Sequence, residues 1–332
     1  MITQDSILVQ LIWLVERVPS PQPPPLRRRG RPIVYSEKLF LKALVIMIVR
    51  RLHKVGELLA VLDEATPEMR VVRELLCEKG RFPTRRTFER RLRALPESLP
   101  DQISCLGRQL VSLLCPWERS GRAVALDSTV LHSGGGVWHK KDREAGIVPH
   151  TTIDTEAAWT NSGWHGWVYG WKLHLAITVA KMWIPLSARL TPANVADNQM
   201  APAMIEELPD EARFVLGDTH YNAQNVRERC ERTERFLVAS KRGAYPHTDS
   251  GVEVRRIFHK LRSLANENFN EHFNEHFKAI FDVHEQVPTK GKLNTARFAL
   301  GAVFVYQLAV LHRYEQKLEV NRGLKPFLRA AG

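Results

Sequence analysis

Two apolar runs, each ending in an aspartate, constrain the fold of this chain more than any other feature. In Ala123–His132, four small or apolar residues lead into Asp127, and a glycine-rich loop follows at 133–136. In Ala212–Asn222, Asp218 occupies the same position relative to its run. Short apolar runs bounded by turn residues are typical of buried strands, and a buried carboxylate needs a partner or a cation. We therefore expect the two aspartates to share one site.

The segments around these runs predict an α/β fold. Residues 164–180 and 183–190 alternate aromatic or apolar residues with small or polar ones, which predicts an antiparallel hairpin. Asn194 and Asp197 then read as a turn and a helix cap. The order of elements is strand, hairpin, helix, strand, helix, strand, helix, with the later helices expected at 197–208 and 222–234 and the last strand at 235–240. This order predicts a mixed sheet flanked by helices.

The amino-terminal part is helical and basic. A helix expected within residues 1–18 is followed by a proline-rich linker at 19–25, which is stiff and extended. Next comes a basic cluster at 27–31, whose charged members are Arg27, Arg28, Arg29 and Arg31. Such a cluster can lie along phosphates or enter a minor groove, or it can be a solvated linker. The net charge of +12 favours a polyanionic partner, although a generically basic protein has the same balance.

Residues 70–95 resemble a helix-turn-helix unit. Thr84 is placed as a helix cap, and Phe88, Leu92 and Leu95 form an apolar stripe. The remaining surface of this helix carries five arginines: Arg85, Arg86, Arg90, Arg91 and Arg93. We predict DNA contact by Arg85, Arg86 and Arg90, while an arginine-rich surface helix is the alternative. The predicted domains are a helical DNA-binding region (1–118), a catalytic domain (119–316) and a carboxy-terminal tail (317–332).

Cysteine spacing and hydropathy narrow the class of protein. The four cysteines contain no C-x-x-C pair, so neither a zinc knuckle nor a disulfide framework is expected. The amino terminus lacks the layout of a secretory signal. The apolar run 298–311 is shorter than the roughly 20 residues that span a bilayer, and it contains Gln307. We predict a buried core helix there and no membrane partner.

Three glutamates in the carboxy-terminal third of the chain lie at four-residue spacing. Glu267, Glu271 and Glu275 share one face of a helix, so spacing alone does not choose among them. The residues Asn-Glu-His-Phe at 270–273 are repeated at once at 274–277. Two-metal phosphoryl chemistry needs converging carboxylates, and oxygen ligands suit Mg²⁺. A third acid on a helix would complete a site with the two strand aspartates.

In this order, the fragments resemble bacterial insertion-sequence transposases of the DDE class, from the helical amino-terminal region to Phe327. The fragments that carry the resemblance lie at 126–129, 169–174, 191–198, 217–221, 267–270 and 277–278. The resemblance implies an RNase H-like catalytic domain. It also implies that Asp127, Asp218 and Glu267 bind two Mg²⁺ ions, with Mn²⁺ as a substitute.

Glu271 is the alternative third ligand. The family places a lysine seven residues after its glutamate, and Lys278 follows Glu271 by seven residues but Glu267 by eleven. The resemblance implies DNA contacts near the acids by Arg262 and Lys278. Lys172, on the hairpin beside the first aspartate strand, is a further predicted DNA contact.

The resemblance implies a DNA transposase that cleaves transposon ends and joins the 3′ hydroxyl to target DNA. Both steps are in-line displacements at phosphorus. The implied partners are terminal inverted repeats and target DNA, bound by a homodimer on paired ends, and the implied location is the bacterial cytoplasm, at the nucleoid.

Three alternatives stay open. A catalytically inactive remnant would bind DNA while its aspartates served only the fold. An RNase H-like host nuclease would share the acids, but no inverted repeats would flank its gene. The motif at His272–His276 matches the H-x-x-E-H arrangement of zinc metallopeptidases, yet it arises inside the tandem repeat and leaves the strand aspartates unexplained.

Overall fold

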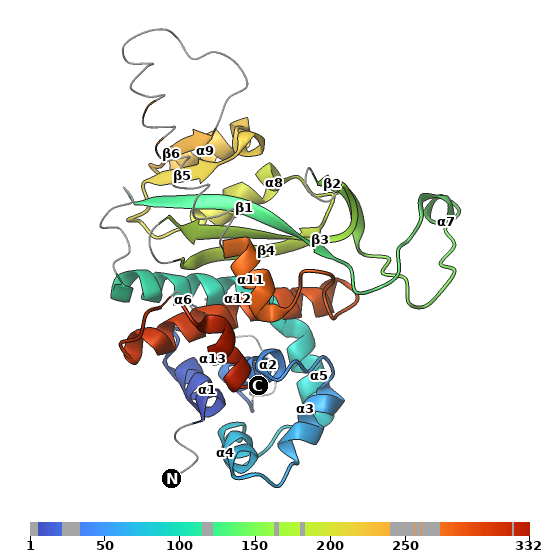
Figure 1. Cartoon of the computed structure of the whole chain (residues 1–332), viewed down its shortest axis with the longest axis vertical. Coiled ribbons are helices and arrows are strands. Elements are labelled where there is room, and N and C mark those ends of the chain that lie inside the picture. The colour runs from blue at the N-terminus through green and yellow to red at the C-terminus, as the bar shows by residue number, and fades with distance from the viewer. Residues whose placement is uncertain are drawn as a thin grey trace. The chain divides into compact units, whose positions relative to one another are not determined.

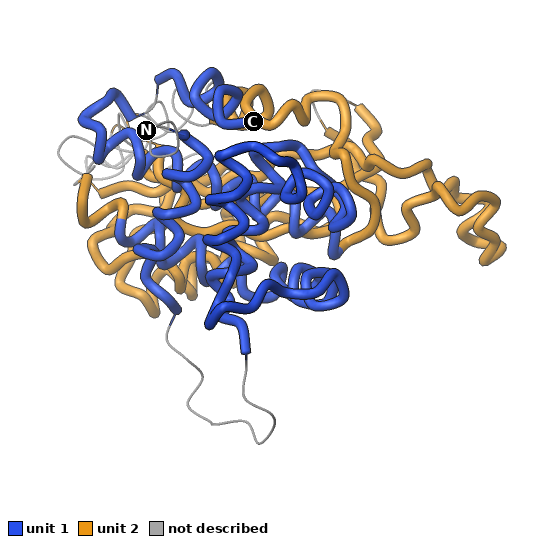
Figure 2. Tube along the Cα trace, turned by 90° about the horizontal axis from the view of Figure 1, so that it is seen from below, with its two compact units in different colours: residues 1–109, 293–332 blue, residues 110–292 orange. Residues whose placement is uncertain are grey.

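The computed structural model describes residues 6–21, 34–114, 122–162, 166–179, 183–239, 256, 260, 273–320 and 322–332. The chain forms two compact units (Figure 2): residues 1–109 with 293–332, and residues 110–292. The sequence prediction grouped 293–316 with the catalytic domain, whereas these residues cluster with the amino-terminal helices. Their contacts explain the grouping: the Leu44 side chain packs at Gly301, and Gln307 Nε2 donates to the Ile103 carbonyl at 2.8 Å.

The first unit is helical within its described residues, apart from one isolated bridge between Glu78 and Arg81. Its helices are α1 (Ile7–Arg17), α2 (Glu37–Val49), α3 (Val55–Leu62), α4 (Pro67–Leu75), α5 (Arg85–Ala94), α12 (Lys292–Glu315) and α13 (Leu324–Ala330), while α6 (Leu99–Leu114) crosses the boundary between units. Thr84 accepts a hydrogen bond from the Thr87 amide, which confirms the predicted cap, and Ser36 caps α2 in the same way by accepting from the Leu39 amide.

Helix α12 is the core helix predicted at 298–311. It is long and apolar enough to cross a membrane by composition, but 94% of its apolar window is buried inside the protein. A helix that is apolar on all sides and covered on all sides is typical of a domain core. Burial therefore accounts for its hydropathy.

The second unit contains a six-stranded mixed sheet (Figure 1). Its strands are β1 (Ala123–His132), β2 (Ala158–Ser162), β3 (Gly166–Thr178), β4 (Pro185–Pro192), β5 (Phe214–Gly217) and β6 (Phe236–Ala239). Strand β1 pairs antiparallel with β3 and parallel with β5, and β5 pairs parallel with β6. The other edge of β3 pairs with β2 along its first half and with β4 along its second.

Helices flank this sheet: α8 (Asp197–Glu206) and α9 (Gln224–Arg232) on one side and α11 (Asn274–Phe281) on the other (Figure 1). The short helix α7 (Lys140–Glu144) lies in the long connection between β1 and β2. The predicted mixed sheet flanked by helices is thus confirmed, as is the antiparallel hairpin of β3 and β4.

A buried carboxylate ties the loop after β1 to the segment that follows α11. Asp154, which is fully buried, accepts hydrogen bonds from Ser133 Oγ at 3.0 Å and from the Gly291 amide at 3.1 Å. A Cβ atom at Gly134 would lie 2.2 Å from the Val287 carbonyl oxygen, so the loop needs glycine to approach this segment. These contacts fix the end of α11 relative to β1.

Candidate active site

The parallel pairing of β1 and β5 sets the two strand aspartates side by side. Ala125 pairs with Leu216, and the same register carried two positions further sets Asp127 opposite Asp218. Neighbouring strands lie about 4.8 Å apart, and residues in register point to the same face. The predicted meeting of the two acids therefore follows from the sheet itself.

Asp127 lies in a site that opposes its ionisation. Burial raises the pKa of its carboxyl to about 7, and the nearby charges of Asp218 and Asp197 add to the rise, against a backbone hydrogen bond from Ser128. Asn274 on α11 donates from Nδ2 to Asp127 Oδ2 at 3.1 Å. The ionised form of Asp127 would be favoured by a cation held between the acids.

This pKa predicts a pH-dependent cost to the fold. In the unfolded chain the Asp127 carboxyl ionises near pH 3.8, whereas in the folded chain it holds its proton up to about pH 7. The raised pKa therefore lowers stability progressively as pH rises from about 4 to about 7. We expect Asp127→Asn to raise the free energy of unfolding at pH 8, by about 1–2 kcal/mol for a partly buried carboxylate, and to change it little at pH 4. Metal-free chemical denaturation at both pH values measures this, and equal effects at both would contradict it.

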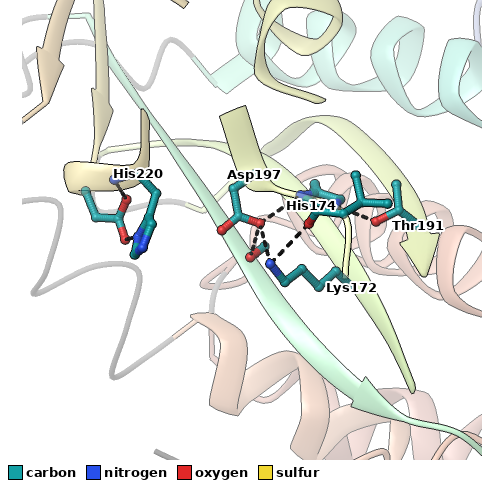
Figure 3. Close-up of polar contacts among 8 residues, drawn as sticks. Lys172, His174, Thr191, Asp197 and His220 are labelled. Carbon is teal, nitrogen blue, oxygen red and sulfur yellow. Dashed lines mark hydrogen bonds and ion pairs between the residues drawn. The ribbon is translucent and has the colours of Figure 1, made fainter. Parts of the chain in front are cut away.

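Asp218 is the more accessible of the two acids. Its Oδ1 accepts a hydrogen bond from the His220 amide at 2.8 Å, and its Oδ2 lies 3.0 Å from His220 Nδ1 (Figure 3). Its side chain is 54% exposed. The carboxylate is thus oriented by the turn that follows β5 and still faces solvent.

A third carboxylate, Asp197, is bound by side chains of the central strands (Figure 3). Its Oδ1 lies 3.1 Å from Lys172 Nζ and 3.5 Å from His174 Nδ1, and it accepts from Ser128 Oγ at 2.9 Å. The Nε2 atom of His174 lies 2.8 Å from Thr191 Oγ1. Burial lowers the pKa of His174 to about 4, so its ring is neutral near pH 7. Lys172 therefore supplies the positive charge that faces Asp197.

Sequence reasoning missed this network. Asp197 was expected to cap a helix, but it is the first residue of α8, and the cap position is Ala196. The signal was the spacing of Lys172 and His174 two residues apart, which places both on one face of β3. Ser128 is the cross-strand partner of His174 and adjoins Asp127, so the network supports β1 beside the acid.

Tyr221 closes the site from within. Its side chain is buried, and burial raises its pKa well above the ordinary value, with further contributions from Asp127, Asp197 and Asp218. A Cβ atom at Gly217 would lie 2.7 Å from Tyr221 Cβ. The glycine before Asp218 therefore makes room for a neutral phenol among the carboxylates.

Two predicted DNA contacts of this unit expose little of their side chains. Lys172 is 14% exposed and is bound to Asp197 and to the Val195 carbonyl. Lys278 is 8% exposed; burial lowers its pKa, and the charges of Glu275 and Asp127 oppose that change. Both lysines face acids of the site, and DNA contact by either stays a prediction.

Several predicted residues lie outside the described part of the chain: Glu267, Glu271, Arg262, Arg27, Arg28, Arg29 and Arg31. Arg85, Arg86 and Arg90 lie on α5 of the first unit and are exposed. Among described residues, no group of three His, Cys, Asp or Glu side chains could hold a metal ion. Asp127 and Asp218 nevertheless offer the hard oxygen donors that Mg²⁺ and Mn²⁺ take, so this pair fits a divalent cation that needs a further ligand.

Comparison with known proteins gives a matching family. Residues 118–267 match the family model described as a transposase DDE domain. No curated protein matches the sequence.

Two solved structures are similar to the chain. One is the piggyBac transposase synaptic complex with hairpin DNA, at 9% identity and a TM-score of 0.36, covering 99% of this chain and 77% of that one. The other is the Mos1 mariner paired end complex with Mn, at 14% identity and a TM-score of 0.21, covering 86% and 80%. The family match spans both strand aspartates, so the part of the chain that contains them is similar to the transposase DDE domain.

Proposed function

We propose that this protein is a DNA transposase that cleaves transposon ends and joins the freed 3′ hydroxyl to target DNA. The observation that carries the proposal is the register of β1 and β5, which brings Asp127 and Asp218 together inside the matched domain. Glu267 or Glu271 would supply the third carboxylate. DDE transposases use divalent metal ions in general, and two Mg²⁺ ions, or Mn²⁺, would be held by these acids.

The bound ions would activate the attacking oxygen and stabilise the leaving one. The side chains of this protein set the geometry for that chemistry. Asn274 orients the Asp127 carboxylate, and Lys278 places a positive charge near it. The Asp197 network supports β1 through Ser128, and the buried Tyr221 side chain lies among the acids. Each of these residues acts on the position or charge of an acid.

The proposed partners are the terminal inverted repeats and target DNA. The net charge of +12 supports a polyanionic partner. A homodimer on paired ends, in the bacterial cytoplasm at the nucleoid, completes the proposal.

DNA cleavage tests the function directly. Purified full-length protein is incubated with a duplex that carries the element's end, with Mg²⁺, with Mn²⁺ or with EDTA. We expect metal-dependent cleavage at the end and transfer of the 3′ end to a second duplex. Binding without cleavage would support the inactive remnant, and cleavage with no preference for the end would support the nuclease.

Asn274 provides a prediction about metal affinity. Residues that orient metal ligands change metal affinity by about 10- to 100-fold when they are removed. We therefore expect Asn274→Ala to raise the Mg²⁺ concentration needed for half-maximal cleavage by about tenfold, with a smaller effect at saturating metal. Asn225→Ala is the matched control. Asn225 lies on α9 and donates a hydrogen bond to the carbonyl of Asn198 on α8. An unchanged Mg²⁺ requirement in Asn274→Ala would remove Asn274 from the site.

A further inference from the structure

Helix α5 presents two opposite faces. Phe88 and Leu92 are fully buried, and Phe88 packs against Phe40 and Phe82 with ring centroids 5.8 and 5.5 Å apart. Arg86, Arg90 and Arg93 are exposed at positions i, i+4 and i+7, and this spacing aligns them along the face opposite the buried one.

The other two arginines of α5 are bound within the protein. Arg85 Nε pairs with Glu89 Oε1 at 2.8 Å. The guanidinium of Arg91 lies over the Phe40 ring, 5.0 Å from its centroid. Arg86, Arg90 and Arg93 have no ion pair or ring partner among the residues that the structure describes. Two arginines of this helix are therefore bound within the protein. The other three, Arg86, Arg90 and Arg93, form an exposed row that we call the arginine row.

The row is held by a rigid support. Thr84 caps the helix, and the aromatic packing of Phe88 fixes its rotation about its own axis. Seven residues of α-helix span about 10 Å, which matches the major groove of about 12 Å. Three fixed cations over this distance fit the phosphates that border a groove, and guanidinium groups bind phosphate strongly.

The connection before α5 differs from a compact helix-turn-helix. Helix α4 ends at Leu75 and α5 begins at Arg85, whereas the motif's turn has about three or four residues. The connection contains the bridge between Glu78 and Arg81 instead. Contact of α5 with DNA therefore depends on the charged face of this helix and not on a helix-turn-helix geometry.

We propose that Arg86, Arg90 and Arg93 bind the phosphates of duplex DNA, and that Arg85 and Arg91 serve the fold. The proposal rests on the proposed function, since it names the surface of a transposase that holds its DNA. It adds Arg93 to the predicted contacts and takes Arg85 from them.

The salt dependence of binding tests this row. Affinity for a fluorescent duplex of roughly 30 base pairs, about three helical turns, is measured in EDTA across a range of salt concentrations. Each lost phosphate contact lowers the slope of log affinity against log salt by about 0.9. We expect R86Q/R90Q/R93Q to lower the slope by about 2.7 and R90Q alone by about 0.9.

R85Q is the matched control, because it removes one arginine from the same helix. We expect R85Q to leave the slope unchanged and R86K/R90K/R93K to keep it, since lysine retains the phosphate contact. Equal slope losses for R85Q and R90Q would overturn the proposal, because they would report net charge alone. Thermal unfolding checks each fold, and R90Q alone decides the outcome if the triple variant unfolds.

The binding experiment is separate from the catalytic one. If the wild type binds DNA and the triple variant has the same salt-dependence slope, the proposed phosphate contacts of the three arginines are wrong. The transposase proposal is not affected by that result. If the slope is lowered in the triple variant but the wild type does not cleave DNA, the phosphate contacts are supported and the catalytic proposal is wrong. Absence of DNA binding by the wild type overturns both.

Discussion

Replacing Asp127 or Asp218 with asparagine is expected to lower the rate of DNA end cleavage by about a thousandfold or more. Asparagine keeps the shape of the side chain and its bond to Asn274 or His220, but it lacks the charge that holds a divalent cation. A loss of about 4 kcal/mol of transition-state stabilisation corresponds to this factor. Single-turnover cleavage of a preformed protein–DNA complex measures the chemical step, so a change in DNA affinity does not enter the rate.

Asp210→Asn is the control for this pair, because Asp210 is exposed in the second unit and precedes β5, whereas Asp218 follows the other end of that strand. It should cleave at the wild-type rate. Asp127→Asn should also lose the rise in melting temperature that Mg²⁺ gives the wild type. Cleavage by either site variant at near the wild-type rate would contradict the assignment of that aspartate to the metal site.

The two strand aspartates could be predicted because the apolar residues before each of them form the buried strand that their pattern indicates. An apolar run such as Ala123–Leu126 fits a buried strand, and its burial places Asp127 in the middle of β1, an interior strand of the sheet. The parallel pairing of β1 with β5 is the kind that alternating strands and helices predict. By contrast, β2 carries the residues Ala-Trp-Thr-Asn-Ser, which lack an alternating pattern. Its pairing depends on β3, so sequence reasoning passed over it.

The remaining features of the site depend on contacts between distant segments. Asp197 lies 69 residues from Ser128, and its role depends on Lys172 and His174 emerging from the same face of β3. Asn274 reaches Asp127 across 147 residues. The grouping of α12 with the amino-terminal helices has the same origin, because an apolar helix shows that it is buried but not which partners bury it.

Glu271→Gln should reduce end cleavage by about a thousandfold, by the same loss of a metal ligand, while Glu267→Gln retains most of the activity. We expect the loss at Glu271 because Asn274 and Lys278 follow it by three and seven residues. Asn274 donates to Asp127, and Lys278 is buried near its charge. These spacings are those of one helical face, and the lysine spacing is the one that the DDE class implies.

Glu275→Gln is the control within the same repeat, since Glu275 lies on α11, is exposed and lies 3.6 Å from His284. It should keep both cleavage and Mg²⁺ dependence. A thousandfold loss in Glu267→Gln with activity retained in Glu271→Gln would assign the third ligand to the residue before the duplicated turn. Activity retained in both variants would mean that neither glutamate binds the metal, and the two aspartates would then need another partner. Deleting residues 270–273 leaves a single Asn-Glu-His-Phe turn and places Asn274 and Lys278 three and seven residues after Glu267. We expect this deletion variant to keep cleavage, because Glu267 then takes the position that Glu271 has in the wild type.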